Sequence, residues 1–241
     1  MGDKTAIDKT EIRDAATILL IRDARTAPRV LMGQRGARAA FMPNKYVFPG
    51  GAVDAGDAQV PLAGRGAEPC LSRLGQSARA GAPENIAHAL LVAAIRELWE
   101  ETGQILGVEA PWGGPVPDDW QGFAKRGFIP SPDGLAFICR AVTPPGNPRR
   151  FDARFFVADA DRLASDPDDF SGVCEELRNL QWIAFDDLMR FDLPFITQVA
   201  LAEIKARLPD LSAPPNVPFF KNNDEESLFL RLGGRSPLEG V

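Results

Sequence analysis

Residues 96–103 read Arg-Glu-Leu-Trp-Glu-Glu-Thr-Gly, and this stretch determines how the rest of the chain is interpreted. It closes an apolar run that begins near Pro83, a residue that suits a first helical turn. Gly103 suits the end of a helix because glycine readily takes the left-handed conformation. We therefore expect a helix over residues 83–103. A rotation of about 100° per residue brings four apolar residues together as its buried stripe: Leu91, Ala94, Ile95 and Leu98.

Three glutamates share another side of this helix: Glu97, Glu100 and Glu101. At spacings of three and four residues, like charges repel and weaken an isolated helix. Two interpretations stay open. The trio is a solvated acidic face, which is common on helices, or a divalent cation neutralises it. The cation is favoured because Arg96 is the one basic residue nearby and the upstream turn, Gly50-Gly51, lets backbone approach closely.

The composition narrows the choice of metal. The 241 residues include one His and three Cys without a CxxC pair, which argues against zinc and iron–sulfur sites. A cation held by carboxylates is then Mg²⁺ or Mn²⁺. The net charge of −6 and the lack of a long basic tract argue against general nucleic-acid binding. No apolar run is long enough for a membrane span, and unpaired cysteines fit a reducing compartment, so we expect a cytoplasmic protein.

Together with Gly51 and Asp57, this stretch resembles the Nudix box, G-x5-E-x7-R-E-U-x-E-E-x-G-U, in which U is a bulky aliphatic residue. Three departures are visible. The gap between Asp57 and Arg96 holds 38 residues where the box has seven, an insertion of 31. Asp57 replaces the first Glu, and Gln104 replaces the last aliphatic residue. We expect the insertion to loop out without moving the glutamates. Asp57 either pairs within the box from a different distance or has no role.

The resemblance implies an α/β (α+β) fold, a Nudix-type α/β/α sandwich with a mixed sheet between helices. The chain's own mixture of strand and helix patterns, without strict alternation, agrees with this. We expect one domain over residues 1–241, with an insertion at about 58–82 and a C-terminal extension from about 209. The segments expected to be loops are 58–82, 111–134 and 159–170. Strands are expected at 17–22, 29–34, 45–48, 136–142, 154–158 and 180–185, and helices after Asp186 and at 197–208.

The resemblance also implies an activity, in which water activated by Mg²⁺ or Mn²⁺ attacks a phosphorus of a nucleoside diphosphate derivative. Glu97 and Glu101 would be the principal ligands, with Glu100 in the same cluster and Gly51 giving a backbone carbonyl. Arg96 would pair with a box carboxylate and fix its position. The base would be one of these glutamates or a more distant one. The candidates beyond the box are Glu175 and Glu176, for which a solvated turn is the alternative.

Residues 32–54, followed by the interrupted box, resemble more weakly the insertion-bearing Nudix branch that includes peroxisomal coenzyme A diphosphatases. This implies CoA or acyl-CoA as the substrate, split into 3′,5′-ADP and a 4′-phosphopantetheine product. The candidate phosphate contacts are Arg35, Arg38 and Lys45, with solvated strand ends as the alternative. ADP-ribose, NADH and dinucleoside polyphosphates stay open as substrates.

A non-catalytic nucleotide-sensing Nudix module also stays open, although the three retained glutamates favour an enzyme. Nudix proteins are often homodimers, and the apolar stretch at residues 228–232 could pack on its own sheet or on a second subunit. His88 is expected to be a packed helix residue. Trp112 and Trp120 either anchor their loop or stack on substrate. Three further arginines could face phosphate or serve a turn: Arg149, Arg150 and Arg154.

Overall fold

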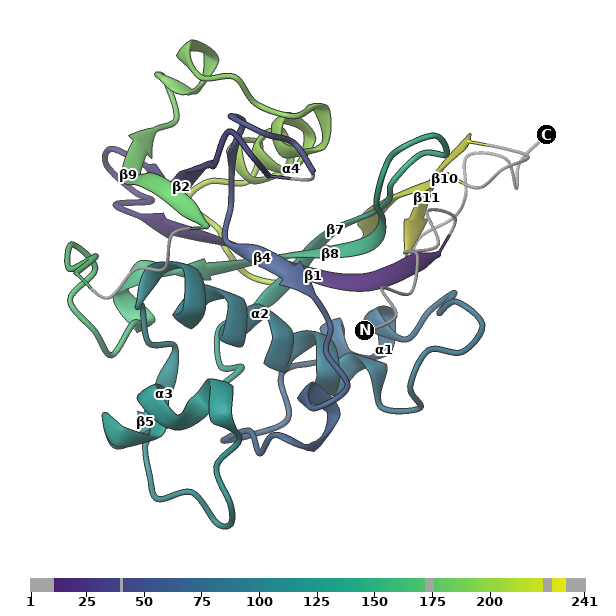
Figure 1. The fold of residues 1–241 in the computed structure, drawn as a ribbon. Coiled ribbons are helices and arrows are strands. Elements are labelled where there is room, and N and C mark those ends of the chain that lie inside the picture. The colour runs from purple at the N-terminus through teal and green to yellow at the C-terminus, as the bar shows by residue number, and fades with distance from the viewer. Residues whose placement is uncertain (1–10, 40, 172–175, 223–226, 233–241) are drawn as a thin grey trace, which may run out of the picture.

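A mixed β-sheet forms the centre of the fold (Figure 1). The computed structural model describes residues 11–39, 41–171, 176–222 and 227–232. The strand order is β11-β10-β7-β8-β1-β2-β3, with β4 paired to β1 and β9 paired to β2. The pairs β1–β8 and β7–β10 are parallel, and the other pairs of this sheet are antiparallel. The strands are β1 (Ile12–Arg22), β2 (Arg29–Arg35), β3 (Tyr46–Val47), β4 (Gly50–Ala52), β7 (Ala136–Val142), β8 (Arg150–Asp159), β9 (Leu177–Ala184), β10 (Val217–Asn222) and β11 (Ser227–Leu232).

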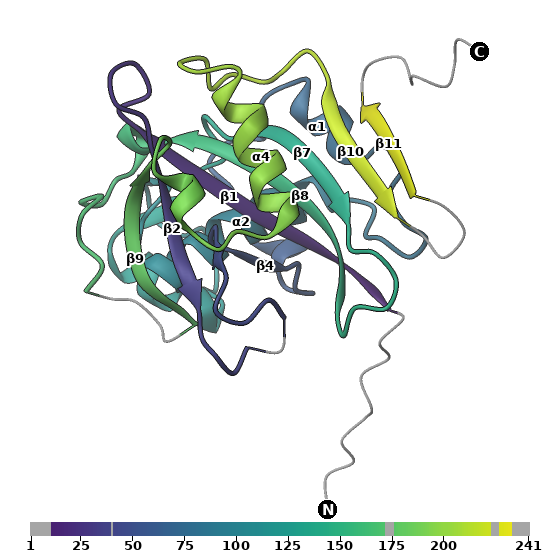
Figure 2. The same cartoon turned by 90° about the horizontal axis from the view of Figure 1, so that it is seen from above.

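Helices cover both faces of this sheet. In Figure 1, α2 and α1 lie below it and α4 above it, and Figure 2 shows α4 crossing the strands. The α-helices are α1 (Cys70–Leu74), α2 (Ile86–Thr102), α3 (Gln121–Lys125) and α4 (Phe195–Lys205). Short 3₁₀ turns are η1 (Asp57–Gln59), η2 (Asp118–Trp120), η3 (Ala160–Arg162) and η4 (Leu188–Arg190).

Strand β1 contributes to two separate cores because successive side chains of a strand point to opposite faces. Ile18 and Leu20 are fully buried in the core on the α2 side. Leu19 and Ile21 are fully buried in the core on the α4 side. The predicted mixed sheet between helices is therefore confirmed.

The box helix is α2, and its end is set by Gly103. This glycine has a φ of 72°, in the left-handed region, and its N–H donates to the Trp99 carbonyl at 2.8 Å. Such a C-terminal cap needs a residue without a Cβ penalty. The four residues of the predicted apolar stripe are all buried, as expected. The helix is thus held firmly against the sheet that carries Gly50 and Gly51.

The residues inserted between Asp57 and α2 are not the loose loop that was expected over 58–82. They contain the end of η1 and the helix α1, and two of their arginines reach distant segments. Arg73 donates to the carbonyls of Pro214 and Pro215 at 2.5 and 2.8 Å, and Arg79 Nε donates to Asp14 at 2.7 Å. The prediction failed because five residues of α1 are too few to show a helical period.

A buried arginine of the sheet also binds this insertion. Arg140 is 1% exposed and donates to the carbonyls of Gln76 and Ser77 at 2.6 and 2.9 Å. Its guanidinium also donates two hydrogen bonds to the Asp152 carboxylate, at 2.8 and 2.6 Å. The insertion is therefore fixed to the sheet by charged groups and not by apolar packing alone.

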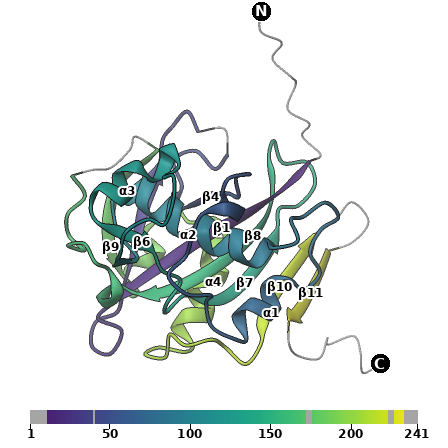
Figure 3. The ribbon, with the colours of Figure 1, turned by 90° about the horizontal axis from the view of Figure 1, so that it is seen from below.

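The segment expected as a loop over 111–134 is likewise partly ordered. Strand β5 (Gly107–Glu109) pairs with β6 (Phe128–Pro130), and α3 lies between them in the chain. Figure 3 shows this unit on the outer side of α2. The ring centroids of Phe123 and Trp99 of α2 lie 5.6 Å apart. The Trp112 indole N–H donates to the Phe128 carbonyl at 2.8 Å. Trp120 is 1% exposed, so both loop tryptophans anchor this unit.

The C-terminal extension adds strands to the same sheet. Strand β10 pairs with β7, and β11 pairs with β10 as the outer strand. The apolar stretch at residues 228–232 therefore lies on the chain's own sheet. No helix among the described residues combines the length and the hydropathy needed to cross a membrane.

Candidate active site

The glutamates of α2 are mostly buried where the helix passes under the glycine turn. Glu97 is 9% exposed and Glu101 is 2% exposed, while one third of the Glu100 side chain is accessible. A solvated acidic face would leave all three accessible, so that interpretation is wrong for this helix. Burying carboxylates is costly unless each finds a partner.

Arg96 is the centre of the contacts that hold this cluster. Its guanidinium donates to Asp57 at 3.0 and 3.2 Å, to Glu97 at 2.9 Å and to Glu100 at 3.1 Å. It also donates to the Ala52 carbonyl at 2.8 Å, which links the helix to β4. Asp57 therefore pairs with Arg96 across the insertion and is not idle.

The strand that pairs with one edge of β1 changes at the site, from β2 to β4. Strand β1 pairs with β2 at Ile21 and Arg22, and with β4 at residues 15–17. This change brings Gly50 and Gly51 over the glutamates. The Gly50 N–H donates to Glu101 Oε2 at 2.8 Å, and a Cβ at Gly51 would overlap the Glu97 carboxylate. Glycine is thus required here for close approach.

A fourth carboxylate reaches the site from β9. Glu176 precedes β9 and lines, with Glu97, Glu100 and Glu101, a recess of about 410 Å³. Glu175, the other candidate, lies outside the described residues. The place of Glu176 could not be predicted from the sequence, because it depends on how β9 pairs with β2.

Burial and mutual repulsion shape the titration of the cluster. Burial raises the pKa of Glu97 to about 7, against the opposing effect of Arg96. Burial and the nearby Glu97 charge raise the pKa of Glu101 to about 8. The pKa of Glu100 is also raised by burial. Burial alone would lower the pKa of Arg96. The hydrogen bond to Asp57 and the charges of the neighbouring carboxylates outweigh this effect and raise the pKa of Arg96.

This chemistry fits a hard divalent cation. Several oxygen donors share one recess, and oxygen donors are the ligands that such a cation prefers. Within the described residues, however, no three Asp, Glu, His or Cys side chains are close enough together to form a complete metal site. Glu97 and Glu100 are held by Arg96, and Glu101 by Gly50.

A larger cavity of about 890 Å³ opens beside the recess, and Glu97 and Glu176 line both. Five arginines also line it: Arg13, Arg35, Arg38, Arg149 and Arg178. Four of them, all except Arg13, have no ion-pair partner among the described residues. Unpaired guanidinium groups are suited to phosphate. The cavity is therefore a basic region in a chain of net charge −6.

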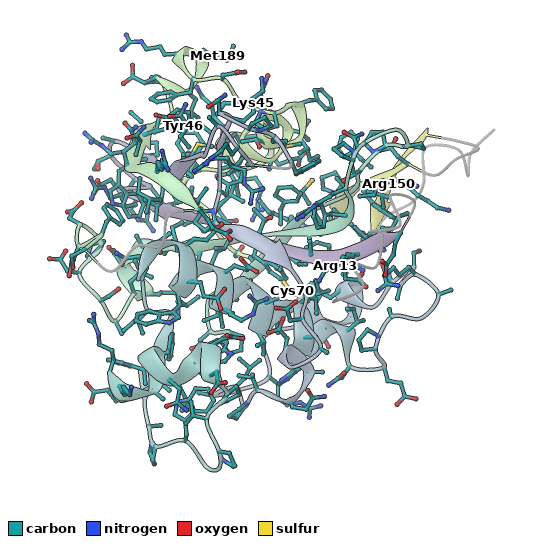
Figure 4. The ribbon with its side chains drawn as sticks, in the orientation of Figure 1. Arg13, Lys45, Tyr46, Cys70, Arg150 and Met189 are labelled. Carbon is teal, nitrogen blue, oxygen red and sulfur yellow. The ribbon has the colours of Figure 1, made fainter. Side chains whose placement is uncertain are left out.

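The sequence candidates for phosphate contact divide into two groups. Arg35 and Arg38 line the cavity. Lys45 does not line it. Its Nζ lies 2.6 Å from Asp192, and Figure 4 shows Lys45 near Tyr46 in the upper part of the molecule. Arg178 also lines the cavity, and the sequence does not predict this, because the place of Arg178 depends on the long-range pairing of β9 with β2.

Two other basic candidates have structural roles. Arg154 is fully buried and donates to Asp14 at 2.6 Å, so it does not face phosphate. Arg150, 5% exposed, donates to the Thr143 carbonyl at 3.1 Å. His88 bonds the Val60 carbonyl at 2.8 Å through Nε2, which matches the expected packed residue.

The fold and the site together define a class of protein with a glutamate-bearing helix under a glycine turn, beside a cavity lined by arginines. No family model matches the chain. A Caenorhabditis elegans protein named "Putative nudix hydrolase 7" is 30% identical over 183 residues, which cover 71% of this chain and 51% of that protein. The chain thus spans about half the length of that curated relative.

A solved NUDIX hydrolase from Alicyclobacillus acidocaldarius is 27% identical, with a TM-score of 0.60, over 86% of this chain and 100% of that one. The fold, the interrupted motif and these matches place the chain in the Nudix hydrolase superfamily.

Proposed function

We propose that this chain is a divalent-metal-dependent diphosphatase of nucleoside diphosphate derivatives, with CoA or acyl-CoA as its substrate. One observation carries the proposal. The recess of four glutamates opens beside Gly51 into a large cavity lined by arginines. Carboxylates for a cation and guanidinium groups for phosphate are thereby adjacent, as hydrolysis of a diphosphate requires.

In this proposal the cation would be held by Glu97, Glu100 and Glu101, with the Gly51 carbonyl beside them. When bound, a divalent cation offsets diphosphate charge and lowers the pKa of water. Arg96 holds Glu97 and Glu100 in position, and Asp57 holds Arg96. Glu176 accepts the proton of the attacking water, since no described basic side chain is paired with it.

The cavity supports the choice of CoA among the diphosphate compounds. CoA carries a third phosphate besides its diphosphate, which suits a cavity with more arginines than a diphosphate needs. The volume of about 890 Å³ also accommodates a large ligand. ADP-ribose, NADH and dinucleoside polyphosphates lack the long pantetheine arm of CoA.

The test is hydrolysis of CoA, acyl-CoA, ADP-ribose, NADH and diadenosine polyphosphates with Mg²⁺ or Mn²⁺. We expect 3′,5′-ADP from CoA, and a loss of at least about 100-fold in kcat for Glu97→Gln and Glu101→Gln. Glu109→Gln, at an exposed position of β5, is the matched control and should retain activity.

If ADP-ribose or NADH is hydrolysed and CoA is not, CoA is rejected as the substrate and the diphosphatase activity is supported. Binding of a nucleotide without turnover of any compound would instead indicate a sensing module. Undiminished activity in both glutamine variants would reject the cation site.

A further inference from the structure

Four alanines of neighbouring strands form a straight row on the cavity side of the sheet. Ala52 of β4 is opposite Ala15 of β1, which is opposite Ala153 of β8, which is opposite Ala141 of β7. Ala141 is in turn opposite Phe220 of β10, and all five residues line the cavity. Directly opposed residues point to the same face of a sheet. The row therefore forms the floor of a trough that crosses the strands.

Larger side chains border this trough on both sides. Residues two positions away along a strand share its face. Arg13 and Phe151 thus flank the floor on one side, and Thr17 and Phe155 on the other, and all four line the cavity. At β1 and β8 the floor of the trough is one residue wide, because these four flanking side chains are all larger than alanine.

The trough leads away from the glutamates. It begins at β4, beside Gly51 and Glu97, and ends at β10. With neighbouring strands about 4.8 Å apart, four steps from β4 to β10 give a length of about 19 Å. This length exceeds that of a diphosphate several-fold. It suits a long, narrow group joined to the diphosphate.

The far end of the trough is aromatic. Phe195 of α4 is 72% exposed, and its ring lies 6.4 Å from that of Phe220. Thr197 is 3% exposed and also lines the cavity. The rings of Phe195 and Phe220 therefore give this end of the trough an apolar surface that an apolar group can cover.

We propose that this trough binds a long, largely apolar arm of the substrate, extending from the diphosphate at Gly51 to Phe195 and Phe220. The proposal rests on the proposed function but adds the determinant of specificity. The four alanines set the width of the arm, and the two phenylalanines contact its end. Compounds with a short or bulky group beyond the diphosphate fill the trough poorly.

The experiment uses adenosine 5′-diphosphate esters of linear alcohols from methyl to dodecyl. Binding is measured by calorimetry in EDTA, where the proposed chemistry does not run, and hydrolysis is measured with Mg²⁺ or Mn²⁺. In the wild-type protein we expect affinity and kcat/KM to rise by about fourfold for each added methylene until the trough is full.

Ala141→Leu and Ala153→Leu block the trough and should reduce the dodecyl-to-methyl ratio at least about tenfold. Because added bulk can impair folding, Phe195→Ala at the exposed end is the second variant, and it should reduce the same ratio. Met189→Ala is the matched control. Met189 is 85% exposed, lies outside the cavity lining and projects from the top of the molecule in Figure 4, so its ratio should equal that of wild type.

Binding that does not depend on chain length would overturn the proposed role of the trough. The same holds if Phe195→Ala changes the preference between adenosine and uridine esters but leaves the length dependence unchanged. Length-dependent binding without any hydrolysis would support the arm-binding trough and reject the proposed diphosphatase function. Hydrolysis without length dependence would support the diphosphatase function and reject the arm-binding trough.

Discussion

The Arg96 guanidinium forms two hydrogen bonds with the Asp57 carboxylate, at 3.0 and 3.2 Å, although 38 residues separate them in the chain. Both side chains are almost fully buried. A shorter carboxylate therefore fills the glutamate position of the box, and the folded insertion brings it within reach. Asp57 is a positioning residue, since it acts on the glutamates through Arg96.

Replacing Asp57 should weaken both stability and activity. Asp57→Asn leaves Arg96 with one fewer buried negative partner, so we expect the free energy of unfolding to fall by about 3 kcal/mol. We expect kcat to fall as well, because Glu97 and Glu100 lose a fixed support. Urea denaturation and steady-state kinetics measure the two effects. Asp54→Asn is the control, since Asp54 is 55% exposed and 3.7 Å from Arg96. Equal effects of the two changes would contradict this role of Asp57.

A methyl group at Gly51 should displace the glutamate beneath it. The added Cβ of Gly51→Ala would overlap the Glu97 carboxylate, which must then move. A displacement of about 1 Å can reduce a rate by about 100-fold, and we expect a loss of that order in kcat. Gly56→Ala is the control, because a Cβ there has nothing within 4 Å. A crystal structure of the Gly51 variant with Glu97 unmoved would refute the explanation.

The metal-free protein should lose stability as the pH rises. The pKa of Glu97 is about 7 and that of Glu101 about 8, mainly through burial, against an ordinary value of 4.5. Between these values the folded chain holds protons that the unfolded chain has released. The stabilisation from these two groups is complete below about pH 4.5 and is lost as the pH passes 7 and 8.

Melting temperatures in EDTA from pH 6 to 9 measure this effect. We expect a decline that Glu101→Gln makes shallower, because glutamine carries no charge at any pH. Mg²⁺ or Mn²⁺ should restore the melting temperature most at the alkaline end, since cation binding favours the ionised carboxylates. An equal slope in the wild-type and glutamine proteins would show that Glu101 does not titrate in this range.

Two basic residues close in sequence should differ in their effect on substrate binding. Arg38 lines the cavity without an ion-pair partner among the described residues, whereas Lys45 is paired with Asp192. We expect Arg38→Ala to raise KM for a nucleoside diphosphate substrate by about tenfold, through loss of a charge-assisted contact. Lys45→Ala should leave KM unchanged. Steady-state kinetics at low and high salt give KM for both variants. A larger increase in KM for Lys45→Ala than for Arg38→Ala would contradict the assignment of Arg38 as the phosphate contact.

The parts of the fold that follow from local pattern were predictable. The helix over 86–102, its end at Gly103 and strand β7 all depend on neighbours in the sequence. The segments α1 and α3 were missed because five residues cannot show a period. Their stability comes from distant contacts, such as the bonds from Arg73 to the carbonyls of Pro214 and Pro215.

The candidate site shows the same division. Glu97, Glu100 and Glu101 were predictable because one helix turn fixes their spacing. The places of Glu176 and Arg178 and the alanine row depend on strand register between segments far apart in sequence. Register is set by which faces are buried, which is a property of the whole sheet.

The anchoring of the insertion has a consequence for the integrity of the chain. On the C-terminal side of the exposed Arg65, Arg79 and Arg140 hold residues 73–79 to the sheet, and Arg73 holds them to the segment before β10. On the other side of Arg65, Asp57 is fastened by Arg96. Cleavage of the peptide bond after Arg65 would therefore leave both halves of the motif in place. Two fragments would remain associated as a nicked protein, held by contacts that do not depend on the covalent link between them.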